Sequence, residues 1–115
     1  MPIHPSFLAG RVPPKIVIYP ASTKATVIGH MVKFRCVVTE GHPVLNLAWY
    51  KGDGTLLIDG SRMHNITDGL VLEFKQAKKK DEGDYLCAAK NKAGFMRAIA
   101  VLTVSGEISC MIYDL

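Results

Sequence analysis

Apolar and polar residues alternate with a period of two in several short segments of the chain. In Val32–Val38 the even-numbered positions are apolar, while Lys33 and Arg35 face the other side. The same alternation recurs in Leu47–Lys51 and in Leu70–Lys75. Because successive side chains of a β-strand point to opposite faces, these three segments are predicted to be half-buried strands.

Turn-forming residues separate the strand-like segments at intervals of roughly ten residues, as in all-β domains. Gly52-Asp53-Gly54 supplies glycines that adopt a positive φ at little steric cost, so Thr55–Ile58 is expected to return as a hairpin partner. About nine short strands without a convincing helix indicate an antiparallel β-sandwich or barrel. The other predicted strands cover Lys15–Tyr19, Lys24–Ile28, Arg62–Ile66, part of Lys78–Gly94, and Phe95–Val104.

The composition of the 115 residues, 49% hydrophobic and 21% charged, is typical of one soluble domain with a single core. Residues 1–14 contain four prolines and are expected to be a tail or linker, followed by a domain over residues 15–104 and an extension over 105–115. We expect no signal peptide and no insertion into a membrane, because no apolar run is long enough. The net charge of +4 is too small and dispersed to favour nucleic-acid binding.

The chain has three cysteines, Cys36, Cys87 and Cys110. An odd count favours one disulfide and one remaining thiol, which is either reduced or paired with another chain. No C-x-x-C spacing is present, and no two histidines share a predicted face. We therefore expect neither a metal nor a cofactor.

The segment Lys78–Gly94, which reads KKKDEGDYLCAAKNKAG, is the most informative part of the sequence. It contains D-x-G-x-Y-x-C at Asp81–Cys87 and N-K-A-G at Asn91–Gly94, and Trp49 lies thirteen residues after Cys36. Together these residues resemble the immunoglobulin superfamily, and the segment is similar to its I-set. The resemblance covers about residues 15–104. It implies an immunoglobulin-like, two-sheet antiparallel Greek-key sandwich.

This resemblance also implies structural roles for individual residues. Cys36 and Cys87 are expected to form a disulfide across the core, beside the indole of Trp49. Asp81 is expected to lie in the turn before the strand of Cys87 and to pair with Arg62. The hydroxyl of a tyrosine at this corner should donate a hydrogen bond back to the chain. The expected core framework is Trp49, Tyr85, Leu72, Asp81 and Arg62.

No group of residues in the sequence indicates catalysis. The histidines fall in the expected tail, in turns and on a weak strand, and neither a G-x-S-x-G motif nor a Walker loop is present. Lys51-Gly52-Asp53 resembles an integrin-binding tripeptide, but a tight turn requires the same glycine and aspartate. The protein is therefore predicted not to be an enzyme.

The expected inward direction of Trp49 and Cys87 fixes which of their neighbours point outward. Along Phe95–Val104, the odd-numbered set includes two polar residues and is placed outside, while the even-numbered set from Met96 to Val104 is placed inside. An apolar outer face of this kind is typical of a protein contact, with another copy or with a different protein, although neighbouring domains can also cover it. The candidate partner-binding residues are Tyr50, Leu86, Phe95, Arg97, Ile99 and Val101.

The opposite sheet is expected to present Lys33, Arg35, Glu73 and Lys75 near Lys15. Rows of lysine and arginine create a positive field, so heparan sulfate is a possible ligand of this face, although solvated strand faces look the same.

Two locations are compatible with the sequence. Asn65-Ile66-Thr67 is an N-glycosylation sequon, and with a cysteine pair it favours an extracellular adhesion molecule, receptor ectodomain or matrix protein. The rival is a cytoplasmic structural module like the I-set repeats of giant muscle proteins, whose cysteines stay reduced.

Overall fold

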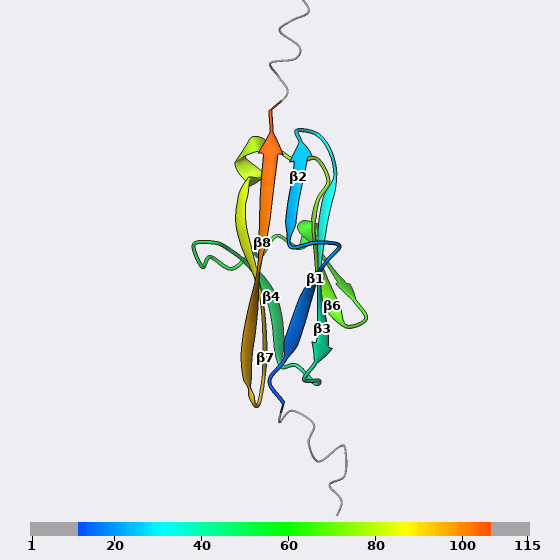
Figure 1. The fold of residues 1–115 in the computed structure, drawn as a ribbon, viewed down its shortest axis with the longest axis vertical. Coiled ribbons are helices and arrows are strands. Elements are labelled where there is room, and N and C mark those ends of the chain that lie inside the picture. The colour runs from blue at the N-terminus through cyan, green and yellow to red at the C-terminus, as the bar shows by residue number, and fades with distance from the viewer. Residues whose placement is uncertain (1–11, 107–115) are drawn as a thin grey trace, which may run out of the picture.

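Two four-stranded β-sheets face each other in the computed structural model, which describes residues 12–106 (Figure 1). Two three-residue 3₁₀ turns, η2 (Gly60–Arg62) and η3 (Lys79–Asp81), join strands of different sheets. The strands are β1 (Lys15–Tyr19), β2 (Thr23–Val27), β3 (Val32–Glu40), β4 (Asn46–Lys51), β5 (Met63–Ile66), β6 (Gly69–Phe74), β7 (Gly83–Asn91) and β8 (Gly94–Ser105).

The strand order is β1-β3-β6-β5 in one sheet and β2-β8-β7-β4 in the other. The chain crosses between the sheets after β1, β2, β3, β4 and β6, which gives the Greek-key arrangement of an immunoglobulin-like sandwich. This fold class was predicted from the sequence and is confirmed. One pair departs from the antiparallel expectation, because β2 runs parallel to β8 with Thr23 opposite Val101.

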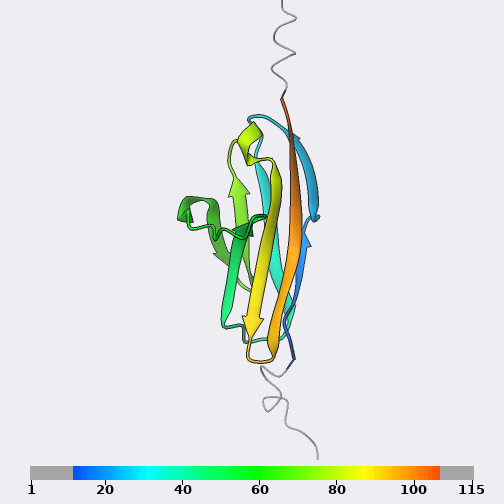
Figure 2. The same cartoon turned by 90° about the vertical axis from the view of Figure 1, so that its left-hand side faces the viewer.

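The prediction that Thr55–Ile58 forms a hairpin strand is wrong. The turn itself forms, with the Thr55 amide donating to the Asp53 carboxylate at 2.8 Å, but only Leu56 makes a bridge to β4, opposite Tyr50. The chain then leaves this sheet, because the next strand, β5, lies in the other one. Figures 1 and 2 show the segment after β4 projecting from the sandwich. Residues 12–106 therefore contain eight strands, where the sequence suggested about nine.

The core lies between the two sheets and is centred on a disulfide. Cys36 of β3 and Cys87 of β7 are fully buried, with an S–S distance of 2.02 Å. The indole of Trp49 is also fully buried, and its Nε1 donates a hydrogen bond to the Leu70 carbonyl at 3.0 Å. Leu72 is completely enclosed between the sheets. The fold thus links its two sheets covalently beside its largest aromatic side chain.

At one end of the sandwich, the segment before β1 is held by Asn91. Its side-chain nitrogen donates to the carbonyls of Val12 at 2.6 Å and Gly41 at 2.8 Å. Pro14 is fully buried, so the chain already packs against the domain before the first strand begins. Residue 12 and residue 106 lie at opposite ends of the sandwich (Figure 1).

Candidate protein-interaction face

The outer face of β4, β7 and β8 is formed by alternate residues of each strand. The buried side chains of Trp49, Cys87 and Ala100 mark the inner face, so their neighbours in the sequence point outward. Strand register places Leu86 opposite both Tyr50 and Ile99. This face holds all of the residues suggested as partner-binding candidates, which are Tyr50, Leu86, Phe95, Arg97, Ile99 and Val101.

Two of these apolar side chains are strongly exposed to solvent. Phe95 is 63% exposed and Ile99 is 55% exposed, whereas Val101 is half-buried beside Thr23 of β2. The even-numbered residues of β8 are buried from Ala100 onward, as the alternation predicts, but Met96 is 39% exposed. Met96, which was expected to face inward, lies opposite Ala89, two residues from the start of β8 at the turn between β7 and β8.

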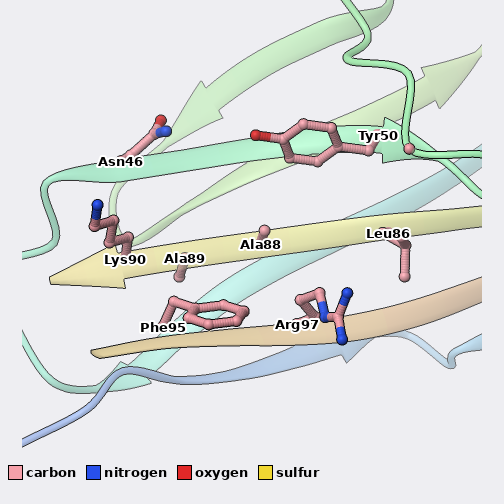
Figure 3. Close-up of a pocket in the computed structure, with 9 residues that line it drawn as sticks. Asn46, Tyr50, Leu86, Ala88, Ala89, Lys90, Phe95 and Arg97 are labelled. Carbon is pink, nitrogen blue, oxygen red and sulfur yellow. The ribbon is translucent and has the colours of Figure 1, made fainter. Parts of the chain in front are cut away.

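A shallow hollow of about 320 Å³ lies on this face (Figure 3). The alanines of β7 form its base, while the rings of Tyr50 and Phe95 border it from the two neighbouring strands. Asn46 also lines the hollow and was not among the sequence candidates. Asn46 and Tyr50 lie four residues apart on β4, so alternation along this strand points both side chains outward. This alternation is the signal that could have identified Asn46. The lining residues are Asn46, Tyr50, Gly54, Leu86, Ala88, Ala89, Lys90, Phe95 and Arg97.

Charged side chains on β7 border the apolar part of the face. Asp84 and Lys90 lie at its two ends, are exposed, and have no ion-pair partner among residues 12–106. The guanidinium of Arg97 lies 5.9 Å from the centroid of the Phe95 ring, in a cation–π arrangement. The face therefore combines a centre of apolar side chains and Arg97 with charges of opposite sign at the two ends of β7.

Three of the framework residues, Arg62, Asp81 and Tyr85, meet around the turn before β7. Arg62 Nη1 lies 3.3 Å from Asp81 Oδ1, and Asp81 is buried in η3. The Tyr85 hydroxyl donates to the Asp81 carbonyl at 2.6 Å, and burial of this phenol raises its pKa. Lys78, Lys79 and Lys80 are exposed around the same turn. The contacts of Asp81 with Arg62 and Tyr85 thus connect η2, η3 and β7.

Asn65 lies on β5, which is an edge strand of its sheet. Its side chain is exposed, and it pairs through the backbone with Leu70 of β6. A glycan on this side chain would extend into solvent without disturbing the core.

The opposite sheet carries fewer free positive charges than the sequence suggested. Glu73, expected to be exposed, is buried because His64 and Lys33 cover it, at 2.7 Å and 3.9 Å from its carboxylate oxygens. The His64 contact holds the pKa of Glu73 below its usual range. Lys15 pairs with Glu40 at 3.6 Å, and Arg35 lies over the Tyr19 ring. Most of the basic residues on this face are thus already partnered.

Residues 12–106 contain no cluster of histidine, cysteine or acidic side chains that could hold a metal ion. No helix within these residues has the length and hydrophobicity needed to cross a bilayer. Cys110, most of the expected N-terminal tail and most of the C-terminal extension lie outside the described residues.

Comparison with known proteins agrees with this geometry. A family model described as "Immunoglobulin domain" matches residues 13–91, which include both core cysteines, Trp49 and Tyr85. The chain belongs to the immunoglobulin domain family.

Relatives of this immunoglobulin domain include a junctional adhesion molecule and a roundabout homologue. Junctional adhesion molecule B of Mus musculus is 33% identical over 98 residues, which cover 73% of this chain and 33% of the relative. Roundabout homolog 2 of Homo sapiens is 40% identical over 73 residues, which cover 64% of this chain and 5% of the relative. The chain thus spans a third or less of these proteins.

Among solved structures, a chimeric titin Z1Z2 carrying a decorin peptide superposes with a TM-score of 0.70. It is 26% identical, and the match covers 83% of this chain and 97% of that one. Immunoglobulin domains similar to this one therefore occur both in an adhesion molecule and in titin.

Proposed function

We propose that this immunoglobulin domain is a non-enzymatic protein-recognition module of the I-set type, and that it binds its partner through the outer face of β4, β7 and β8. The observation that carries the proposal is the exposure of Phe95 and Ile99 next to the hollow lined by Tyr50 and Leu86. Large apolar side chains grouped on one face of a soluble domain are typical of a contact site. The face occurs on β-strands of a disulfide-linked sandwich, so it is rigid before the partner arrives.

Replacing Ile99 with aspartate is expected to weaken self-association or partner binding at least about tenfold, because a charge would enter the apolar centre of the contact. Phe95→Asp should act in the same way. The fold should persist in both variants, since neither side chain contributes to the buried core. Sedimentation velocity over a range of concentrations measures self-association, and surface plasmon resonance measures binding to a purified partner.

Met31→Asp is the matched control for the two face variants. Met31 is 58% exposed, close to the value for Ile99, but lies in the turn between β2 and β3. The Met31→Asp variant should bind the partner as tightly as the parent chain does. If Ile99→Asp and Phe95→Asp bind as tightly as the parent chain and keep its melting temperature, this face is not the binding site.

We further propose an extracellular location, supported by the Cys36–Cys87 pair in the core, the exposed sequon and the adhesion-molecule relative. The chain isolated from its native source is expected to carry a glycan on Asn65 and an intact Cys36–Cys87 bond. Peptide mass spectrometry with and without a glycosidase measures both. Reduced cysteines and an unmodified Asn65 would instead favour the cytoplasmic structural module, the class represented by the titin neighbour.

Heparan sulfate binding by the opposite sheet is a weaker alternative. Lys33 and His64 are engaged by Glu73, and Lys15 by Glu40, so the local positive field is small. On the face of β4, β7 and β8, by contrast, Asp84 and Lys90 have no ion-pair partner among residues 12–106. This face is therefore the better-supported binding site.

A further inference from the structure

On the face of β4, β7 and β8, a row of three large side chains lies beside a row that contains two alanines. One row consists of Tyr50, Leu86 and Ile99, which are direct cross-strand neighbours. The next row, which lies two residues away on each strand, consists of Ala48, Ala88 and Arg97. The rows are roughly 7 Å apart, because a strand rises about 3.4 Å per residue. The face thus has a ridge of large side chains beside a depression over two alanines.

The unpaired charges on β7 are placed symmetrically about these rows. Asp84 lies two residues before Leu86, and Lys90 lies two residues after Ala88. Both point outward, and each is three residues from Cys87, the midpoint of the pattern. The face therefore has an acidic end next to its ridge and a basic end next to its depression.

A surface that contacts a copy of itself across a two-fold axis must be self-complementary. An axis that lies in the interface, at right angles to the strands and level with Cys87, exchanges the two ends of the face. It places the ridge of each copy over the depression of the other. It also brings Asp84 of each copy to Lys90 of the second copy, so the two rows and the charges at the two ends are matched by one operation. Arg97 of each copy then faces Ile99 of the other.

We infer that the partner of this face is a second copy of the chain, packed face to face in this antiparallel, two-fold arrangement. The inference rests on the proposed function, which it deepens by naming the partner. Facing sheets pack about 10 Å apart, with side chains from both sheets interdigitating. Leu86 and Tyr50 of one copy would enter the hollow of the other, whose base is formed by Ala88. Two identical Asp84–Lys90 pairs would fix the direction in which the copies lie.

Charge reversal tests the arrangement directly. Asp84→Lys or Lys90→Asp is expected to raise the dimer Kd roughly tenfold or more, because each change replaces two attractions by two repulsions. An equimolar mixture of the two single variants should recover dimers, since one copy then carries lysine at both positions and the other carries aspartate at both. The double variant Asp84→Lys/Lys90→Asp should recover self-association on its own. Sedimentation velocity of the full chain measures every case.

Lys75→Asp, just after β6 on the opposite sheet, is the matched control and should leave the dimer Kd unchanged. Thermal melting of each variant reports whether the fold persists. If Ile99→Asp dissociates the dimer but neither the mixture nor the double variant recovers it, the face binds a second copy in another orientation and the antiparallel arrangement is wrong. If the parent chain stays monomeric at the highest concentration while Ile99→Asp impairs binding of a different purified protein, the second copy is excluded and the proposed function stands.

Discussion

Cys87→Ala in a Cys110→Ala background is expected to lower the melting temperature by roughly 15 °C or more. The bond between Cys36 and Cys87 joins residues 51 positions apart. Closing a loop of this length restricts the unfolded chain and is worth on the order of 4 kcal/mol in the chain-entropy description. For a domain of this size, each kcal/mol corresponds to about 4–8 °C in melting temperature. Differential scanning calorimetry under non-reducing conditions measures the shift.

The Cys110→Ala chain is the reference for this comparison, because it differs from the test variant only at Cys87. Strong reductant should lower the melting temperature of the reference chain and leave that of the Cys87→Ala variant unchanged. If reductant does not affect the reference chain, the bond does not form under those conditions. The domain would then have to be stable with two thiols in its core, as a cytoplasmic module must be.

Period-two alternation was sufficient to locate most of the fold. The strands around Phe34, Trp49 and Leu72 each bury one side against the core, so their apolar positions could be read directly. The disulfide was accessible only through the resemblance, since three cysteines permit several pairings. Its position then determined which neighbours of Cys87 point outward, including Leu86.

Features that depend on contacts distant in the sequence could not be predicted. Thr55–Ile58 has the composition of a strand, but the crossing to β5 in the other sheet ends its pairing after one bridge. Glu73 follows the outward alternation of β6, yet His64 from the edge strand β5 covers it. In both cases the outcome is decided by a neighbour that only the folded sheet order supplies.

Only part of the candidate face could be predicted, because its arrangement also depends on how neighbouring strands pair. The outward direction of Tyr50, Leu86 and Ile99 follows from parity within each strand. Their alignment into one row requires the register between strands, which the sequence does not reveal. The opposed charges of Asp84 and Lys90, which lie on the same strand, became meaningful only when that register placed the two rows between them.

Asn91→Ala is expected to lower the free energy of unfolding by about 2–6 kcal/mol, at roughly 0.5–1.5 kcal/mol for each of the four hydrogen bonds lost. The side chain is 2% exposed and makes four hydrogen bonds. Its nitrogen donates to the carbonyls of Val12 and Gly41, and its oxygen accepts from the amides of Ala93 and Gly94. Three chain segments therefore lose a common anchor. Urea denaturation followed by tryptophan fluorescence measures the change.

Asn91→Asp separates the two halves of this anchor. The variant keeps an oxygen that can accept from Ala93 and Gly94, but it places a carboxylate against the carbonyl oxygens of Val12 and Gly41, which lie 2.6 Å and 2.8 Å from the present nitrogen. Repulsion and burial should raise the pKa of this carboxyl in the folded state. Stability relative to the parent chain is then lowest at neutral pH and recovers as the pH falls toward the unfolded-state pKa of about 3.9, because the protonated carboxyl can donate again. Urea denaturation of both chains over this pH range measures the difference, and an aspartate variant as stable as the parent at pH 7 would contradict the assignment of the Asn91 nitrogen to these two carbonyls.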